Sequence, residues 1–337
     1  MPSPVPSRPP TLDEVAERAR VSRTVASRVI NNGPNVSRAK RDAVEKAIRE
    51  LGYTPNRSAR ALATRQTGVV VLAVCGDGPE VFGDPFFAQV IVGASAALEK
   101  TDLHLMLSLA TNDHGQRRLR QFLQTRGADG VMLVATRGAD PLIDIATKSG
   151  LPTVFIGLPV HGTPPYYVDV DNAGGSRAAT EHLLSRGRRR IAMIAGPEDT
   201  AVGRERLRGY TEALLLAGLE PYATAPGDFL EASGAEAMRA LLRSHPDLDA
   251  VVAANDNMAA GALRVLRDAG RAVPGDVAVV GFDDVPIALH TDPTLTTMHQ
   301  PVQSLGREAA RMLVELLDGA QPTSLILPAK LVVRESA

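Results

Sequence analysis

The chain has 337 residues, 44% hydrophobic and 22% charged, which is the composition of a globular protein with two or three domains. Its one cysteine, Cys75, excludes an intramolecular disulfide and a cysteine-based structural zinc site, and no window approaches the roughly 18 apolar residues of a membrane span. The net charge of −1 is unevenly distributed. Residues 1–66 carry 13 Lys and Arg against 6 Asp and Glu, a net +7, whereas the rest carries 24 against 32, a net −8. A basic segment on an acidic body is typical of a DNA-binding module joined to another domain.

Residues 1–10, MPSPVPSRPP, are Pro-rich, which predicts a flexible tail. The tail contains no apolar run that would serve as a signal peptide. We therefore expect the protein to stay in the cytoplasm.

Two short helices joined by a tight turn are predicted in residues 11–31, TLDEVAERARVSRTVASRVIN. Thr11 and Glu14 have the spacing of a capping box, and Ser22 is placed to cap the second helix. Apolar residues recur at helical spacing at Leu12, Val15, Ala16 and Ala19, and then at Val25, Ala26 and Val29. The opposite face of the second helix carries Arg23, Thr24, Ser27 and Arg28. This pattern favours a helix that reads the DNA major groove; the alternative is a helical hairpin with solvated charges.

A third helix is predicted at residues 38–51, with Ser37 as its N-cap and Gly52 at its C-terminal stop. Residues 55–63, PNRSARALA, then predict a shorter helix capped by Asn56. This segment is too short to be helical in water by itself, because about 12–15 residues are marginal.

Apolar runs alternate with amphipathic stretches from Gly68 onward. The runs predict strands at 68–75, 103–109, 129–134, 152–156, 190–195, 250–253 and 277–281. Helices are predicted at 85–100, 114–126, 140–149, 172–186, 203–217, 232–244, 256–269 and 302–318. Continuous apolar strands with helical crossovers indicate parallel sheets covered on both faces. The series is too long for one sheet, so we expect two doubly wound α/β lobes with a ligand cleft between them.

The sequence of the body shows no enzyme motif. Gly76-Asp77-Gly78 follows the first strand of the body but lacks the third glycine of a dinucleotide fingerprint. There is no Walker lysine motif, no HExxH and no Gly-x-Ser-x-Gly, and the seven histidines show no metal-ligand spacing. Asp283 and Asp284 are adjacent on one strand end, so their side chains diverge, which favours a hydrogen-bonding role for one of them over a catalytic pair. We therefore expect neither catalysis nor a cofactor.

Polar residues stand where an open α/β sheet binds ligands, just after the ends of its strands. They are Asn255 and Asp256, Asp283 and Asp284, and Arg206 in the helix after another strand. Each of these residues also has a purely structural explanation. We expect Asp256 to cap the next helix, and Asp283 would also suit the cap of a turn. Arg206 could lie on a solvated face of its helix.

The pieces TLDEVA, VS, SRVIN, VS, ELGY, PN, AR and LA, in that order, resemble the DNA-binding headpiece and hinge of the lactose/galactose repressor (LacI/GalR) family. The resemblance implies a tail at 1–10, a helix-turn-helix DNA-binding domain at 11–54 and a hinge at 55–66. It implies DNA contacts from Thr11, Ser22, Arg23, Thr24, Ser27, Arg28, Asn31, Ser37, Tyr53, Asn56, Arg57, Arg60 and Leu62. In the family, the leucine that matches Leu62 wedges into the minor groove and kinks the DNA. One departure concerns base preference: this chain has Val25-Ala26 where family members commonly carry Thr-Val.

The rest of the chain continues the resemblance and implies a periplasmic-binding-protein-like core at 67–337. The expected fold class is thus an all-α helix-turn-helix headpiece followed by a two-lobed α/β core of doubly wound parallel sheets. The first lobe is expected at about 67–187 and 296–322, and the second at about 188–293 and 325–337, with three crossings between them.

The resemblance also implies effector-binding residues in the core. The matches are Phe86, Phe87, Arg206, Phe229, Asn255, Asp283 and Gln300. The loop 76–83 is longer than usual before its Pro-Phe-Phe, which alters the cleft mouth. An Arg, an Asn, an Asp and an aromatic plate suit a sugar, but equally a purine base. We favour a sugar or sugar derivative.

We therefore expect a homodimeric transcription regulator, a repressor, whose affinity for a palindromic double-stranded DNA operator is controlled by this small molecule. The chain ends soon after its last strand without heptads, which favours a dimer over a coiled-coil tetramer. Whether the effector releases or promotes DNA binding stays open. Two other classes fit less well: a transport solute-binding protein would need a signal peptide and no basic headpiece, and a dehydrogenase would need the missing fingerprint.

Overall fold

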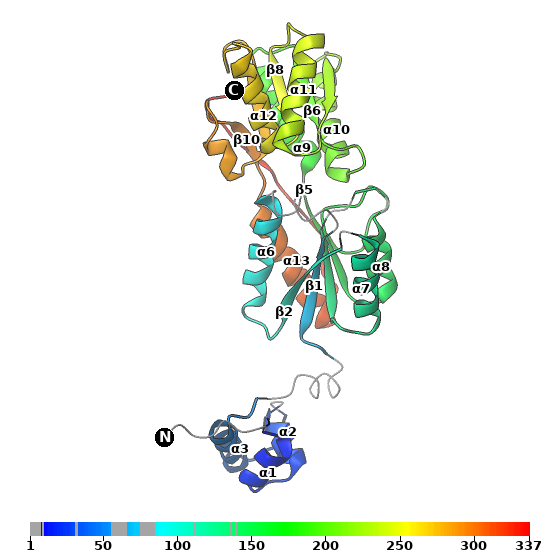
Figure 1. Cartoon of the computed structure of the whole chain (residues 1–337), viewed down its shortest axis with the longest axis vertical. Coiled ribbons are helices and arrows are strands. Elements are labelled where there is room, and N and C mark those ends of the chain that lie inside the picture. Colours follow the sequence, from blue (N-terminus) through cyan, green and yellow to red (C-terminus); the bar gives the residue numbers. More distant parts are fainter. Residues whose placement is uncertain are drawn as a thin grey trace. The chain divides into compact units, whose positions relative to one another are not determined.

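The computed structural model describes residues 8, 10–30, 33–54, 66–74, 85–110, 112–134, 137–138 and 140–337. These residues fall into two compact units, one up to Thr67 and one from Gly68 (Figure 1). The first is the headpiece and the second is the core. None of the described helices combines the length and apolar character needed to cross a membrane.

The headpiece contains three helices, α1 (Leu12–Arg18), α2 (Arg23–Ile30) and α3 (Arg38–Leu51), as the sequence predicts. Thr11 and Glu14 form the predicted capping box, and Gly52 ends α3 at a φ of +61°. The three helices share a small core made of Val15, Ala16, Ala26, Val29, Val44 and Ala47. The all-α headpiece is therefore confirmed.

The first sheet of the core has the strand order β11-β5-β4-β3-β1-β2, and all its pairings are parallel. Its strands are β1 (Val69–Val74), β2 (His104–Leu109), β3 (Gly130–Val134), β4 (Thr153–Ile156), β5 (Tyr167–Val170) and β11 (Leu325–Leu327). Helices α6 (Pro85–Leu98) and α13 (Val302–Leu317) pack on one face, and α7 (Asp113–Gln124) and α8 (Pro141–Ser149) on the other. A Cβ atom at Gly93 would lie 1.9 Å from the Gln303 carbonyl oxygen, so only glycine allows the close packing of α6 on α13. This sheet and its helices are the first lobe.

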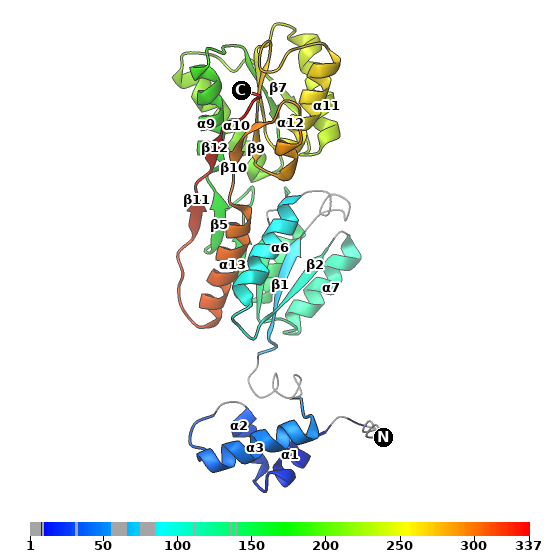
Figure 2. The ribbon, with the colours of Figure 1, turned by 90° about the vertical axis from the view of Figure 1, so that its left-hand side faces the viewer.

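The second sheet has the order β12-β10-β9-β8-β6-β7 and is parallel except for β12, which runs antiparallel to β10. Its strands are β6 (Ile191–Ala195), β7 (Ala223–Pro226), β8 (Ala250–Ala253), β9 (Ala278–Asp283), β10 (Thr296–His299) and β12 (Lys330–Val332). Helices α9 (Asn172–Ser185) and α10 (Ala201–Leu216) lie on one side, and α11 (Glu231–Ser244) and α12 (Asp256–Asp268) on the other (Figure 2). A 3₁₀ turn, η1 (Pro286–Leu289), follows β9. This sheet and its helices are the second lobe.

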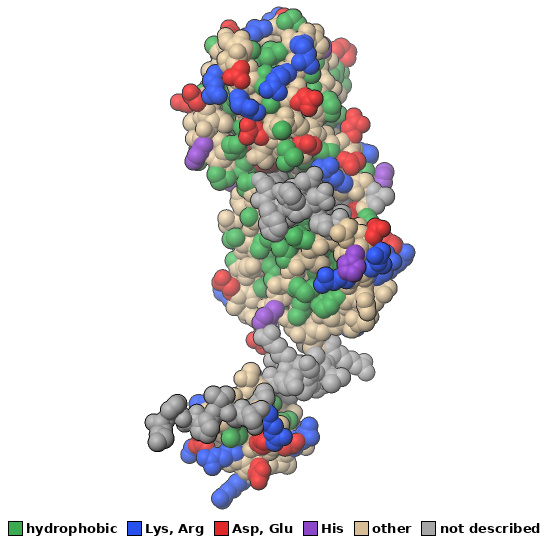
Figure 3. Space-filling view, in the orientation of Figure 1, with side chains coloured by type: hydrophobic (Ala, Val, Ile, Leu, Met, Phe, Trp, Pro, Cys, Tyr) green, Lys and Arg blue, Asp and Glu red, His purple; other side chains and the backbone are tan. Residues whose placement is uncertain are grey.

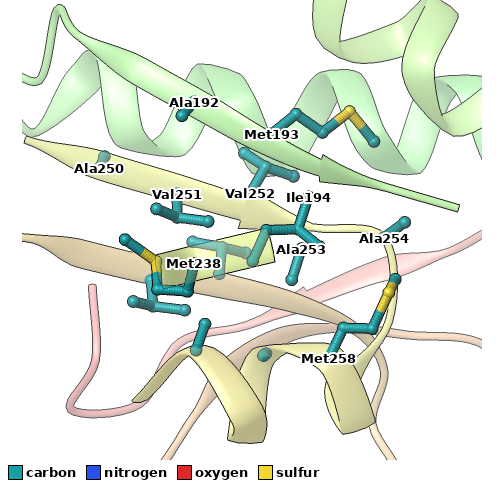
Figure 4. Packing of buried hydrophobic residues seen from close by; sticks show 14 of the residues in the cluster. Ala192, Met193, Ile194, Met238, Ala250, Val251, Val252, Ala253, Ala254 and Met258 are labelled. Carbon is teal, nitrogen blue, oxygen red and sulfur yellow. The ribbon is translucent and has the colours of Figure 1, made fainter. Parts of the chain in front are cut away.

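The core of the second lobe is built from apolar side chains on both faces of the sheet. Met193 and Ile194 of β6 and Val251 and Val252 of β8 all belong to this core, and in Figure 4 Met193 and Met258 of α12 lie on opposite faces of the sheet. These continuous apolar strands are what the sequence predicts for parallel sheets with two covered faces. The two-lobed α/β architecture is therefore confirmed.

The sheets divide the chain differently from the expected lobe boundaries. Helix α9 packs on α10 and on the second sheet, so the chain enters the second lobe at Asp171 and not near residue 188. Strand β10, expected in the first lobe, pairs with β9 of the second. The final run LILPAKLVV is two strands, β11 on the first sheet and β12 on the second. Pro328 separates them because proline cannot continue a hydrogen-bonded ladder.

The sequence did not predict strands β5, β7 and β10, each of four residues. Their sequences YVDV, ATAP and TTMH lack a continuous apolar run. They are strands because neighbouring strands supply their hydrogen bonds.

Candidate functional site

A buried ion pair lies at the carboxyl edge of the second sheet. Arg206 of α10 donates from Nη1 to Asp283 Oδ1 at 3.0 Å, and the two side chains are 4% and 9% exposed. Thr200, six residues before Arg206, caps α10 and fixes the start of the helix near the strand ends. A buried pair of this kind persists only when further hydrogen bonds satisfy both partners. The alternative of a solvated helix face is wrong for Arg206.

The remaining contacts of Arg206 hold its guanidinium in one orientation. Nη1 also donates to the Ala254 carbonyl oxygen at 2.5 Å, and Nε donates to Asn172 Oδ1 at 2.9 Å. The guanidinium carbon lies 3.6 Å from the centroid of the Phe282 ring, a cation–π contact. Residues from three segments, namely α9, the turn after β8, and β9, thus position this cation before any ligand arrives.

Asp283 ends β9 in a strained backbone. Its φ is +110° and that of Asp284 is +59°, values that non-glycine residues rarely adopt. Asp283 Oδ1 also accepts from Gln300 Nε2 at 2.7 Å. Asp283 therefore links the second sheet to the segment in which the chain crosses back to the first lobe, and its side chain is used for more than a turn cap.

The neighbouring aspartate is tied to two other segments. Asp284 accepts from Arg334 Nη2 at 2.6 Å and contacts His299 Nδ1 at 3.0 Å. Arg334 also donates to the Leu295 carbonyl oxygen at 2.8 Å. These bonds hold the strained turn in place.

Asn255, and not Asp256 as expected, caps α12. Asn255 is the N-cap of α12, because its Oδ1 accepts from Met258 N at 3.0 Å. Asp256 is the first helical residue and does not cap. Its buried carboxylate accepts from Val285 N at 2.9 Å and from Thr297 Oγ1 at 2.5 Å. Burial, and then the nearby Asp283 charge, raise the pKa of Asp256 well above its ordinary value.

Asn255 also positions the candidate aromatic plate. Its Nδ2 donates to the Phe229 carbonyl oxygen at 2.9 Å, and Asn257 Nδ2 reaches the same oxygen at 3.4 Å. Phe229 has a φ of +73° and a half-buried ring, and a Cβ atom at Gly196 would lie 2.6 Å from its Cζ. Gly196 directly follows β6. The structure therefore places Phe229, Asn255 and Asp283 at the carboxyl ends of β7, β8 and β9, with Arg206 of α10 bonded to Asp283.

The two expected aromatic residues of the first lobe open α6. Phe86 and Phe87 are half-buried, with ring centroids 5.4 Å apart and planes at 86°, an edge-to-face pair. The preceding loop 76–83 lies outside the described residues.

Sequence reasoning missed Asp169 and Asn172, which join the two lobes. Asp169 lies in β5 of the first lobe and its carboxylate accepts from Leu158 N at 3.2 Å and Val170 N at 2.7 Å. Asn172 opens α9 of the second lobe and donates from Nδ2 to Asp169 Oδ1 at 3.3 Å. Burial raises the pKa of Asp169 to about 6. A carboxylate inside the short run YVDV was the signal available in the sequence.

In the headpiece, α2 presents the expected polar face. Ser22 caps α2 through Val25 N at 3.3 Å, and Arg23, Thr24 and Arg28 are exposed while Ser27 is half-buried. Ser37 occupies the N-cap position of α3 without a side-chain capping bond. Tyr53 packs against the core of the headpiece. The expected contacts Asn31, Asn56, Arg57, Arg60 and Leu62 lie outside the described residues.

Two family models match the chain. The model described as bacterial regulatory proteins, lacI family, matches residues 11–56, and the model described as a periplasmic binding protein-like domain matches residues 180–337. The HTH-type transcriptional regulator CelR of Thermobifida fusca is 47% identical over 98% of this chain and 98% of the relative. The HTH-type transcriptional repressor CytR of Escherichia coli (strain K12) is 31% identical over 97% of this chain and 96% of the relative.

Two solved structures of similar proteins each match nearly the whole length of this chain. A transcriptional regulator CelR–cellobiose complex has a TM-score of 0.78 and 45% identity, over 97% of this chain and 100% of that chain. The Lac repressor dimer bound to operator and the anti-inducer ONPF has a TM-score of 0.85 and 29% identity, over 98% of this chain and 99% of that chain. The chain therefore belongs to the lacI family of bacterial regulatory proteins, as a DNA-binding transcriptional regulator and not an enzyme.

Proposed function

We propose that this regulator acts in the cytoplasm as a homodimer that represses transcription from a palindromic operator, and that cellobiose or a closely related glucose disaccharide sets its operator affinity. The effector binds between the lobes, at the carboxyl edge of the second sheet. The observation that carries the proposal is the preformed Arg206–Asp283–Gln300 network beside Phe229, in a chain 45% identical to that of a regulator solved with cellobiose.

The chemistry of this network suits a sugar. A hydroxyl group both donates and accepts, so it joins a network of buried charged groups without leaving Arg206 or Asp283 unpaired. An aromatic ring such as Phe229 offers a flat apolar surface for the C–H face of a pyranose. A purine presents donors and acceptors in fixed positions, and is the comparison ligand for the test.

The operator is read by α2 of each headpiece. Its exposed Arg23, Thr24 and Arg28 are the side chains available to base edges in the major groove, where Arg forms bidentate bonds to guanine. The dimer places two such helices on a palindromic site.

Apolar side chains are grouped over the first lobe on the face shown in Figure 3, and Val92 of α6 and Leu107 of β2 are 54% and 38% exposed. This face is our candidate for the dimer contact.

Titration calorimetry with cellobiose, maltose, lactose and hypoxanthine tests the effector, and fluorescence anisotropy with a labelled palindromic operator tests the response. We expect cellobiose alone to bind tightly and to change operator affinity by about 5- to 150-fold, the usual range of allosteric coupling. Whether the sugar lowers or raises operator affinity shows whether it releases the regulator from DNA or promotes its binding. Asp283→Asn is expected to keep the operator affinity of the sugar-free wild type and to lose the response to sugar. Binding of hypoxanthine in preference to every sugar would overturn the proposal.

A further inference from the structure

The polar residues at the effector site continue beyond it into the first lobe. A buried series of side-chain hydrogen bonds leads from Asp283 through Arg206 to Asn172, and from Asn172 to Asp169. Asp169 and Asn172 are 9% and 5% exposed. This hydrogen-bond series therefore joins residues of both lobes at the first crossing of the polypeptide, and all four of its residues are buried.

The Asn172 amide can serve this series in only one orientation. Its Nδ2 faces two acceptors, Asp169 Oδ1 at 3.3 Å and the Val170 carbonyl oxygen at 3.1 Å. Its Oδ1 accepts from Arg206 Nε at 2.9 Å. A negative Asp169 carboxylate accepts only, so it favours the amide orientation that turns the oxygen toward Arg206. A proton on Asp169 Oδ1 would face the Nδ2 donor and break this bond, so that only Val170 and Arg206 would hold the amide.

We propose that Asp169 is a positioning residue of the effector site: from the first lobe it orients the Asn172 amide, and through that amide the Arg206 guanidinium of the second lobe. Effector affinity therefore depends on the charge of Asp169, although Asp169 does not touch the effector. Two charged groups of α10 act on it: Arg206 favours its carboxylate and Glu205 disfavours it.

The charge of Asp169 changes in an accessible pH range. Burial raises its pKa to about 6, against the lowering effects of the backbone donors and Arg206. Loss of a proton at rising pH then locks Asn172, and gain of a proton at falling pH releases it. Sugar affinity is expected to fall as the pH drops through about 6.

The first experiment needs no effector. The Nε–Hε signal of Arg206 in the full-length protein is assigned by its absence in Arg206→Lys and is followed by ¹H–¹⁵N NMR between about pH 5 and pH 7.5. We expect the signal to titrate with a midpoint near pH 6 and to be constant in Asp169→Asn. In Glu205→Gln the midpoint should move to lower pH, because a charge that raises the pKa of Asp169 is removed. Asp171→Asn is the matched control, an exposed carboxylate two residues away that caps α9 through Gly174 N. It should titrate like the wild type.

The second experiment uses cellobiose as the probe, which rests on the proposed function. Its Kd should rise about fivefold from pH 7.5 to pH 5 in the wild type and in Asp171→Asn, and stay constant in Asp169→Asn. An Arg206 signal that does not titrate overturns the proposal, and so does a titrating signal with a constant Kd. If cellobiose binds at no pH, the proposed effector is wrong, and the NMR titration decides the role of Asp169 by itself.

Discussion

Arg334 donates from Nη2 to Asp284 Oδ1 at 2.6 Å, and so joins the segment after the last strand to the turn that carries Asp283. The positive φ values of Asp283 and Asp284 cost on the order of 1–3 kcal/mol each and persist only where the surroundings hold them. Arg334, His299 and the Asp256 bond to Val285 N supply that support. The Asp283 carboxylate is thus held by contacts from parts of the chain far apart in sequence.

Arg334→Met should therefore weaken both folding and effector binding. The bond is mostly buried, so we expect a loss of about 1–3 kcal/mol in the free energy of unfolding, measured by urea denaturation, and a higher cellobiose Kd. Arg311→Met is the matched control, since Arg311 is 62% exposed and pairs with Glu308 and Glu315 on its own helix. It should cost under about 1 kcal/mol. Equal effects of the two substitutions would contradict the support role of Arg334.

Asn255→Ser separates the two roles of Asn255. Serine is a good N-cap, so α12 should lose at most a few tenths of a kcal/mol, about the difference between good caps. The shorter of the two hydrogen bonds to the Phe229 carbonyl oxygen is lost and only the 3.4 Å bond from Asn257 stays, so the ring should become more mobile and the cellobiose Kd should rise. Asn112→Ser makes the same change at the cap of α7, where Oδ1 accepts from Gly115 N, and should leave the Kd unchanged. An unaltered Kd in Asn255→Ser would show that Phe229 needs no such tether.

Asp256→Asn should change how stability depends on pH. The folded-state pKa of Asp256 is raised, so the wild type binds a proton there that the unfolded chain releases, and its stability falls as the pH rises above the ordinary carboxyl range. An asparagine has no such dependence and keeps an oxygen for Val285 N. The Tm of Asp256→Asn relative to wild type should therefore increase as the pH rises above the ordinary carboxyl range. A constant or shrinking difference would mean that Asp256 is charged in the folded protein.

Arg28→Ala tests base reading by α2. Loss of a bidentate contact should reduce operator affinity by about 1–3 kcal/mol while leaving affinity for random DNA nearly unchanged. Arg49→Ala, an exposed arginine of α3, should change both affinities alike or not at all. A similar loss on operator and random DNA in Arg28→Ala would reduce Arg28 to a phosphate contact. Salt-dependent anisotropy titrations measure both affinities.

The sequence by itself determined the headpiece and the outline of the core. The capping box at Thr11, the cap at Ser22 and the αL stop at Gly52 are contacts between residues close in sequence, so the limits of α1, α2 and α3 can be predicted. The long apolar runs determined the main strands in the same way, because a strand covered on both faces must be apolar throughout.

The tertiary structure alone decided the short strands and the polar network. β10, β11 and β12 are too short for their sequences to fix their partners, and neighbouring strands assign them to different lobes. Asn255 rather than Asp256 caps α12 because Asp256 meets buried donors from residues about 30 and 40 positions away. Arg206 is buried because its side chain bonds to Asn172 and Asp283, whereas Arg208, on the opposite side of α10, is exposed. Contacts of such long sequence separation leave no local pattern, and the low dielectric of the interior gives them their strength.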